Sequence, residues 1–136
     1  MAILWNPTSP FEHPYWQFLQ DAGSALRLPL QSEEAKDAKD LEPAFDAMVR
    51  EHAGAVIVLS DSFMTAHRAT LARLAADRRL PALYGHNLYP EAGGLMSYGP
   101  SVPELVRGAA AYVDKILKGE KPAELPVQQP VKFDLI

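Results

Sequence analysis

The sequence has no cysteine, which excludes disulfide frameworks, thiolate metal sites and a cysteine nucleophile. It also lacks a clustered basic stripe, and its formal net charge of −4 and pI near 5.5 argue against nucleic acid and anionic membrane surfaces as partners. The first ten residues, MAILWNPTSP, contain no basic segment and too short an apolar run for a signal peptide or a membrane span. As written, the chain is expected to stay in the cytoplasm when it is expressed.

Sequence motifs for nucleotide, metal and covalent chemistry are missing as well. No G-x-G-x-x-G follows the first expected strand and no lysine-serine pair follows Gly93-Gly94, so we predict no nucleotide cofactor. The four histidines show no metal-ligand spacing, so we predict no metal site. Ser60, Asp61 and His67 lie close in sequence, but no G-x-S-x-G surrounds Ser60, and Asp61 is explained more simply as a helix cap. No catalytic residue is predicted, and a small hydrolase that uses Ser60 is kept as an alternative.

What the chain does have is a regular alternation of short apolar strands and longer amphipathic helices. Its 136 residues, 48% of them hydrophobic, suffice for one domain with a core. Residues 55–59, AVIVL, are mostly β-branched and do not alternate with polar residues, as expected of a strand covered on both faces. The expected elements are strands at 2–5, 27–31, 55–59 and 80–84, and helices at 14–26, 40–52 and 62–79. This order predicts an α/β fold with a doubly wound parallel sheet and flanking helices.

Local patterns set the expected faces and ends of the helices. Asp40 is expected to cap the second helix, after a charged, solvated segment at residues 32–39. The third helix is expected to run unbroken from the Ser60-Asp61-Ser62 turn. The first helix is expected to turn one apolar face inward, formed by Phe18, Leu19, Ala22 and Leu26.

The character of the chain changes beyond Pro100. Ser101 and Glu104 form a capping-box pattern in front of a helix with a continuous apolar stripe. A proline-rich segment at 121–130 then leads into an alternating strand at 131–136. We therefore expect an α/β ligand-binding lobe at residues 1–100, followed by a helix-strand arm at residues 101–136.

The candidate ligand site lies where the strands end. In a parallel sheet ligands bind outside the carboxyl ends of the strands, and the residues found there are Asn6, Ser60, Asp61, Tyr84 and Gly85. A glycine-rich loop follows the last of these strands and adds Glu91, Ala92, Gly93 and Gly94. Bare backbone in that loop permits close approach, and the carboxylate can receive a ligand amine or cap neighbouring amides. An ordinary glycine-rich connection explains the same composition.

Several long segments are similar to one known family. AILWNP, AGAVIVLSDSF, LPALYG, EAGGLMSYGP and YVDKILKG with the following LPVQQP and KF resemble bacterial ABC transporter substrate-binding proteins with the type I periplasmic-binding fold. The resemblance implies two α/β lobes that close over a small organic solute, with aromatic amino acids as a first guess for that solute. It also implies an ABC permease as partner and a periplasmic location. The cleft-facing positions that it implies are the strand-end and loop residues named above.

The chain also departs from that family. Members of the family are longer, so the chain resembles a C-terminal-lobe fragment, and its arm would pack on a lobe that is not present. The apolar stripe of the arm would then be exposed, and we expect a homodimer, with exchange of the arm between copies as the economical route. Residues 86–90 differ from the family pattern, which leaves the ligand open. A free-standing α/β signalling or interaction module is the alternative function.

Overall fold

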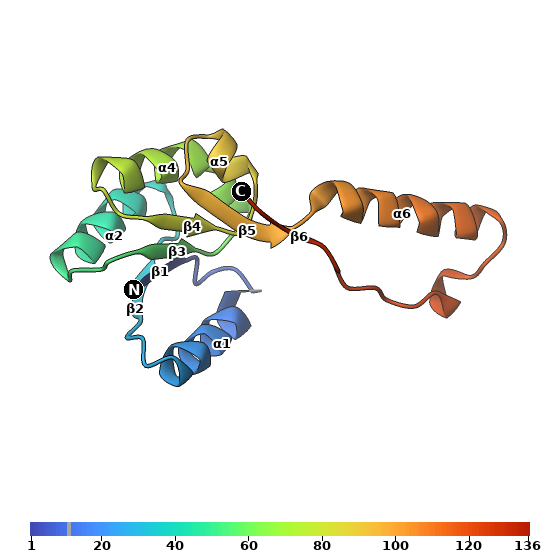
Figure 1. Cartoon of the computed structure of the whole chain (residues 1–136), viewed down its shortest axis with the longest axis horizontal. Coiled ribbons are helices and arrows are strands. Elements are labelled where there is room, and N and C mark those ends of the chain that lie inside the picture. Colours follow the sequence, from blue (N-terminus) through green and yellow to red (C-terminus); the bar gives the residue numbers. More distant parts are fainter. Residues whose placement is uncertain (11) are drawn as a thin grey trace.

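One six-stranded sheet organises the molecule. The computed structural model describes residues 1–10 and 12–136. Strand order is β2-β1-β3-β4-β5-β6, and neighbouring strands are parallel except for β6, which runs antiparallel to β5 (Figure 1). The α/β prediction with a mainly parallel sheet is therefore confirmed. The strands are β1 (Ala2–Trp5), β2 (Gln31–Glu34), β3 (Val56–Val58), β4 (Ala82–Tyr84), β5 (Met96–Pro100) and β6 (Phe133–Leu135).

Helices cover both faces of this sheet. In Figure 1, α2, α4 and α5 lie on one face, α1 lies on the other, and α6 projects away from the sheet. Among the described residues, no helix combines the length and the apolar character needed to cross a membrane. The helices are α1 (Glu12–Ala25), α2 (Ala38–Arg50), α3 (Ser62–Ala66), α4 (Arg68–Asp77), α5 (Leu88–Glu91) and α6 (Val102–Leu117), with a short 3-10 turn, η1 (Pro122–Glu124).

The core lies between the central strands and the α2–α4 layer. Alternate residues of β1, β3 and β4 point into it because successive strand side chains face opposite sides of the sheet. The helices contribute side chains spaced by three or four residues, so one stripe of each helix is buried. The largest fully buried side chains include Phe45, Met48, Leu71, Tyr84 and Tyr89.

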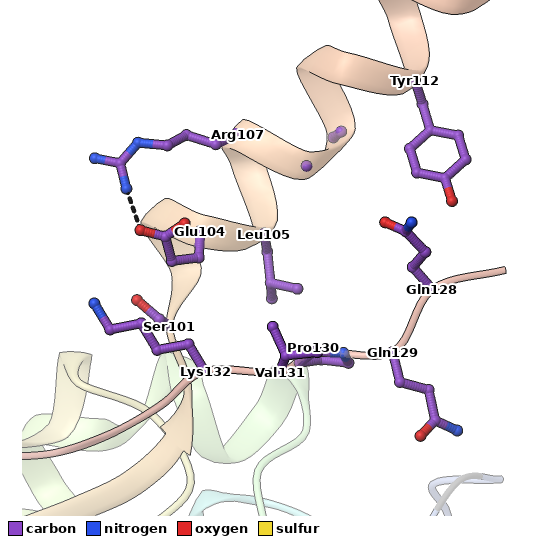
Figure 2. Close-up of a pocket in the computed structure, with 12 residues that line it drawn as sticks. Ser101, Glu104, Leu105, Arg107, Tyr112, Gln128, Gln129, Pro130, Val131 and Lys132 are labelled. Carbon is purple, nitrogen blue, oxygen red and sulfur yellow. Dashed lines mark hydrogen bonds and ion pairs between the residues drawn. The ribbon is translucent and has the colours of Figure 1, made fainter. Parts of the chain in front are cut away.

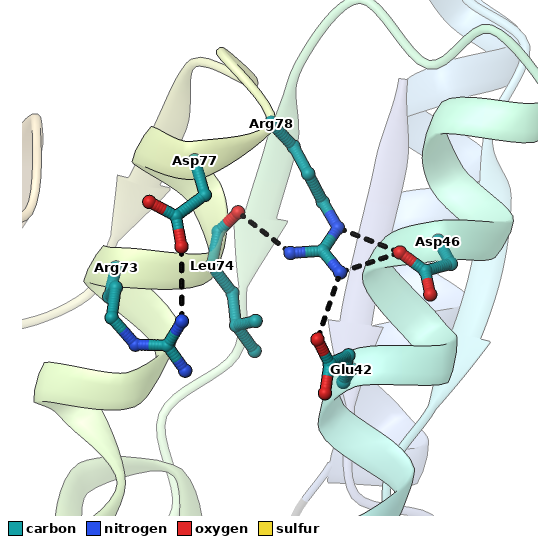
Figure 3. Close-up of polar contacts among 6 residues, drawn as sticks. All are labelled: Glu42, Asp46, Arg73, Leu74, Asp77 and Arg78. Carbon is teal, nitrogen blue, oxygen red and sulfur yellow. Dashed lines mark hydrogen bonds and ion pairs between the residues drawn. The ribbon is translucent and has the colours of Figure 1, made fainter.

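An ion pair joins the two helices of this layer on their outer side. Arg78, just after α4, donates to Oδ1 of Asp46 in α2 from Nη2 at 2.6 Å and from Nε at 2.9 Å (Figure 3). Glu42, one turn earlier in α2, lies 3.6 Å from the same Nη2. The Arg78 side chain is mostly covered, whereas both carboxylates are exposed to water. This pair fixes the orientation of α4 on α2, and it adds at most about 1 kcal/mol because water screens its acidic partners.

The start of α2 corrects one prediction. Asp37, not Asp40, is the N-cap: its backbone is extended and its side chain accepts from the amide of Lys39 at 3.0 Å. Asp40 lies three residues later and accepts from the amides of Lys36 and Asp37. The two aspartates thus form a reciprocal capping box, and the prediction mistook its second member for its first.

Two further element boundaries differ from the predictions. The second strand is Gln31–Glu34 rather than residues 27–31, because Arg27 has a left-handed φ of 54° and Pro29 cannot donate a ladder hydrogen bond. The expected long helix after Ser62 is two helices, α3 and α4, which meet at His67. His67 is the last cap of one and the first of the other, with its ring Nδ1 2.9 Å from the carbonyl oxygen of Phe63.

Helix α1 packs on the sheet through a different face from the one predicted. Phe18 and Leu26 are 70% and 74% exposed, so the expected inward face points largely to solvent. Trp16 instead stacks on Trp5 of β1, with ring centroids 6.0 Å apart. Gly23 lies against Leu30, where a Cβ atom would come within 2.8 Å of the leucine side chain. The prediction followed the aliphatic periodicity, whereas the contact is made by a tryptophan and a glycine.

The C-terminal segment extends from the sheet edge. Residues 96–100, expected as loop, form the fifth parallel strand, and β6 returns to pair with it, with Tyr98 stacked on Phe133 at 5.6 Å. None of the described residues of α6 is buried, and its apolar stripe faces solvent. The expected capping box is not seen in the described chain, because the Ser101 side chain makes no cap hydrogen bond. The division at residue 100 remains a prediction.

Candidate ligand-binding site

The carboxyl ends of the central strands open into a cavity of about 640 Å³. Segments that are far apart in the sequence form its wall because the parallel strands β1, β3, β4 and β5 all end at this edge. Ser9, Pro10, Glu12 and Tyr15 line one side, and the junction of β5 and β6 closes another. The lining residues are Ser9, Pro10, Glu12, Tyr15, Leu59, Ser60, Asp61, Ser62, Gly85, Tyr98, Gly99, Pro100 and Phe133.

Two carboxyl groups and an amide form the polar corner of this cavity. Oε2 of Glu12, at the start of α1, accepts from the backbone amide of Asn6 at 2.5 Å. The Asn6 side chain donates through Nδ2 to Oδ2 of Asp61 at 2.6 Å. The other oxygen of Asp61 caps α3 by accepting from the amide of Met64 at 2.7 Å. Asn6 therefore links the two acidic side chains and holds both in place.

Glu12 is the group most altered by this environment. Its side chain is only 3% exposed, and burial raises its pKa from 4.5 to about 7. The hydrogen bond from Asn6 opposes this rise in pKa, while the nearby charge of Asp61 adds to it. Oε1 of Glu12 is buried and accepts no hydrogen bond from the described residues. A buried carboxyl with one unpaired oxygen costs stability, and such groups are often found at functional sites.

The rest of the cavity wall is aromatic. Tyr15 of α1 is 60% exposed and Tyr98 of β5 is 55% exposed. Phe133 of β6 stacks on Tyr98 and extends the same wall. Exposed rings beside a buried acidic corner are suited to a small organic molecule with an apolar body and a polar end.

The structure brings together four of the predicted site residues. Ser60, Asp61 and Gly85 line the cavity, and Asn6 lies behind Asp61 and holds it. Ser60 lies directly opposite Gly85, where an added Cβ would come within 3.2 Å of the serine Oγ. The strand-end rule therefore predicts residues that line or adjoin one cavity, and their role in ligand binding remains a prediction.

Tyr84 is not placed where a ligand can stack on it. Its ring is 1% exposed and stacks on Tyr89 of α5, with centroids 4.5 Å apart, inside the core. Burial raises the pKa of Tyr84 to about 12, and its hydroxyl has no hydrogen-bond partner among the described residues. Tyr84 is therefore part of the core and does not line the cavity.

The loop residues Glu91, Ala92, Gly93 and Gly94 also do not line this cavity. Helix α5 and the turn at Gly93, which has a left-handed φ of 96°, return the chain to the opposite edge of the sheet, where β5 begins. Glu91 is exposed and accepts a hydrogen bond from Asn87 at 3.0 Å. Gly94 serves packing instead, because a Cβ there would lie 2.8 Å from the ring of Tyr84.

Sequence reasoning missed Glu12 and the aromatic wall. Glu12 occupies the first turn of a helix, where an acidic residue is normally a solvated partner of the helix dipole. Tyr98 belongs to the segment that was expected to be loop. One signal was present in the sequence: the Asn6-Pro7 turn is followed within one short loop by an acidic residue, which topology places beside the end of the first strand.

A larger cavity of about 820 Å³ lies on the arm, between α6 and residues 128–132 (Figure 2). Three of its polar lining side chains have partners: Arg107 pairs with Glu104, and the Tyr112 hydroxyl donates to the carbonyl of Pro126. Both of its walls are exposed elements outside the core. We therefore assign the candidate site to the smaller cavity, where a buried, incompletely paired group is present.

Among the residues whose side chains the structure describes, no group of three or more acidic or histidine side chains is placed to hold a metal ion.

Replacing Asp61 with asparagine is expected to lower the pKa of Glu12. Asparagine keeps a side-chain oxygen that can cap α3, but it removes the negative charge that disfavours a second one nearby. The decrease should be less than one pKa unit, because desolvation is the largest cause of the rise and remains. Carboxyl-carbon NMR titration of Glu12 measures it, with Asp21→Asn on the same helix as the matched control. An unchanged or higher pKa in Asp61→Asn would contradict the described corner.

A family model described as "ABC transporter substrate binding protein" matches residues 2–136. The chain belongs to the ABC transporter substrate-binding protein family. No curated protein sequence matches it closely enough to count as a relative.

Solved structures share the fold of this substrate-binding family member. A conserved domain protein from Vibrio cholerae is 22% identical with a TM-score of 0.86, and the match covers 99% of this chain and 45% of that one. A ligand-free, open substrate-binding protein with adhesive properties from Clostridium difficile is 16% identical with a TM-score of 0.76, over 98% and 45% of the two chains. An ABC domain in complex with L-Trp from Streptococcus pneumoniae is 17% identical with a TM-score of 0.80, over 93% and 43%.

These matches also show how the length of this chain compares with that of the matched structures. It spans about 45% of the length of the first of those structures. The family and the lobe-like fold predicted from the sequence are therefore confirmed, and the chain matches less than half of the length of each of these structures.

Proposed function

We propose that this chain forms one half of a solute-binding site for an ABC-type importer, and that the solute contacts the cavity at the carboxyl ends of β1, β3, β4 and β5. The observation that carries the proposal is the buried corner formed by Glu12, Asn6 and Asp61 beside exposed aromatic rings. Membership of a substrate-binding family supports a binding role without a catalytic step. In this role the protein acts outside the cytoplasmic membrane and delivers its solute to a permease.

An aromatic amino acid is the first solute to test. The wall formed by Tyr15, Tyr98 and Phe133 can stack on a ring, and the cavity volume of about 640 Å³ falls in the range typical of small-molecule sites. One structure of the same fold carries L-Trp. That likeness shows the fold alone, so the choice of ligand rests on the aromatic wall.

The arm has a separate role in this proposal. The apolar stripe of α6 and the larger cavity beside it are surfaces that the other half of a complete protein would cover. The homodimer expected from the sequence, with or without exchange of the arm, is the alternative way to bury the stripe. Sedimentation of the chain at micromolar concentration separates a dimer from a monomer.

The test of the proposed function is ligand-induced stabilisation of this chain. Half a site encloses little of a ligand, so we expect a Kd of about 1 mM or weaker for L-tryptophan. At ten times that Kd, binding adds roughly 1.4 kcal/mol to the free energy of unfolding, which a thermal-shift measurement detects.

Filling the cavity supplies the control. Gly85 lines the cavity, so Gly85→Leu is expected to abolish the stabilisation by L-tryptophan. Gly54 has open space around its Cβ position and lies away from the cavity, so Gly54→Leu is expected to keep it. Equal stabilisation of both variants would refute a site at the strand ends. Turnover of generic esters that Ser60→Ala removes would instead favour the hydrolase.

A further inference from the structure

The charged side chains that the structure describes in the lining of the candidate cavity are all acidic. Glu12 and Asp61 both line it, and no lysine, arginine or histidine is present among the lining residues that the structure describes. The remaining wall is aromatic or small. An anionic ligand group would meet two carboxyl groups here without a cation to offset them, whereas a cationic group would meet acceptors and ring faces.

The Glu12 carboxyl group provides an acceptor that has no partner within the described chain. Its Oε2 is held by the Asn6 amide, while the buried Oε1 accepts no hydrogen bond from any described residue. Rotation about the terminal carboxylate torsion of a glutamate is broad, so the group can turn toward the cavity while one oxygen keeps the Asn6 amide. An ammonium group, with three donors, can bond to Glu12 and to Asp61 together.

We propose that Glu12, supported by Asp61, receives a protonated amine of the solute, so that this half of the site selects ligands by a positive charge next to an aromatic or apolar body. This inference rests on the proposed function, because it concerns the same cavity. Beyond the proposed function, it specifies that the bound group is positively charged and that Glu12 is the residue that selects it. The carboxylate of an amino-acid ligand then points away from this corner.

Proton release accompanies binding in this arrangement. Near pH 7 the free site holds Glu12 partly protonated, because burial raises its pKa to about 7, and an arriving ammonium favours the ionised form. Among the described groups, Asp61 at the start of α3 raises the pKa of Glu12, and the charge of Glu12 in turn raises the pKa of Tyr89 in α5. Burial raises the pKa of Tyr89 further above its ordinary value, so Tyr89 stays neutral and Glu12 is the group that titrates.

Three indole compounds test separately how the amine and the carboxylate of the ligand contribute to binding. Tryptamine keeps the amine alone, indole-3-propionate keeps the carboxylate alone, and L-tryptophan has both. In amide NMR titrations of this chain at pH 8, we expect tryptamine to bind at least as tightly as L-tryptophan, and indole-3-propionate to bind at least tenfold more weakly. The affinity for tryptamine should fall about tenfold for each pH unit below 7, because protonated Glu12 no longer carries the charge.

Glu12→Gln tests the assigned residue. It should weaken tryptamine binding at pH 8 at least tenfold and flatten the pH profile, whereas Glu51→Gln at the far end of α2 should change neither. Indole-3-propionate binding as tightly as tryptamine, or full tryptamine affinity in Glu12→Gln, would overturn this inference while the proposed function stands. Absence of cavity shifts with all three compounds would overturn the proposed function and the inference with it.

Discussion

Replacing Glu12 with glutamine is expected to raise the free energy of unfolding at pH 8 by about 3 kcal/mol. The folded chain holds the Glu12 proton up to a pKa of about 7, whereas an unfolded glutamate releases it near 4.5. The stability contributed by that proton is fully present below pH 4.5 and is lost as the pH rises through 7. At about 1.4 kcal/mol for each pKa unit, the loss approaches about 3.5 kcal/mol above pH 8. Glutamine has no proton to lose and can still accept from the Asn6 amide.

Urea unfolding at pH 4, 6 and 8 measures this effect. The unmodified chain should lose stability between pH 4.5 and 7 through this group, and Glu12→Gln should lose less over the same range. Glu51→Gln removes an exposed carboxylate and serves as the control for the change in net charge. If Glu12→Gln were less stable than the unmodified chain at pH 8, the carboxyl group would be stabilising the fold, and our description of the corner would be wrong.

The predicted gain also bears on function. Glu12 lowers the stability of the fold at neutral pH, and glutamine in its place would raise that stability. Stability alone therefore does not explain a glutamate at this position. Such trade-offs between stability and activity are common at binding and catalytic sites. Higher stability together with weaker ligand binding in the same variant would identify Glu12 as a residue that serves the ligand.

Gly99→Ala is expected to destabilise the chain by on the order of 1 to 3 kcal/mol. Gly99 lies in β5, and a Cβ atom there would overlap with the carbonyl oxygen of Gly85, just after β4. Because the obstacle is backbone, a side-chain rotation cannot relieve it, and the ends of β4 and β5 must move apart. Both glycines line the cavity, so the variant should also lose ligand-induced stabilisation.

Gly108→Ala is the matched control for this change. Gly108 lies in α6, and its Cβ position has open space around it. Alanine favours a helix over glycine by roughly 1 kcal/mol, so this variant should be as stable as the unmodified chain or more so. Urea denaturation midpoints compare the two variants. A Gly99→Ala chain as stable as Gly108→Ala would show that β4 and β5 do not approach as closely as described.

The sheet was largely predictable from the sequence because its central strands have strong local signals. The apolar run around Val56–Val58 predicts a strand that is buried on both faces. Strand β5 was missed because its sequence, MSYGP, contains glycine and proline and alternates only weakly. It is held as a strand by pairing on both sides, with β4 and β6, and such nonlocal pairing is not visible in a local pattern.

The candidate site was predictable only where topology alone decides position. Asn6, Ser60, Asp61 and Gly85 follow strand ends directly, so a parallel sheet places them at one edge. Glu91 to Gly94 were misplaced because α5 carries the chain back to the other edge before β5. The depth of Glu12 depends on how α1 packs, and that contact is made by Trp16 rather than by the predicted aliphatic face.

Amide chemical-shift mapping of this chain with L-tryptophan tests the central claim most directly. We predict that the largest shifts fall on Ser60, Asp61, Ser62, Gly85 and Gly99, around the cavity at the strand ends. Shifts concentrated on residues 104–112 and 128–132 would place binding in the larger cavity of the arm and would contradict our assignment. Shifts concentrated on residues 91–94 would also contradict it, because they would move the site to the glycine-rich turn at the other edge of the sheet.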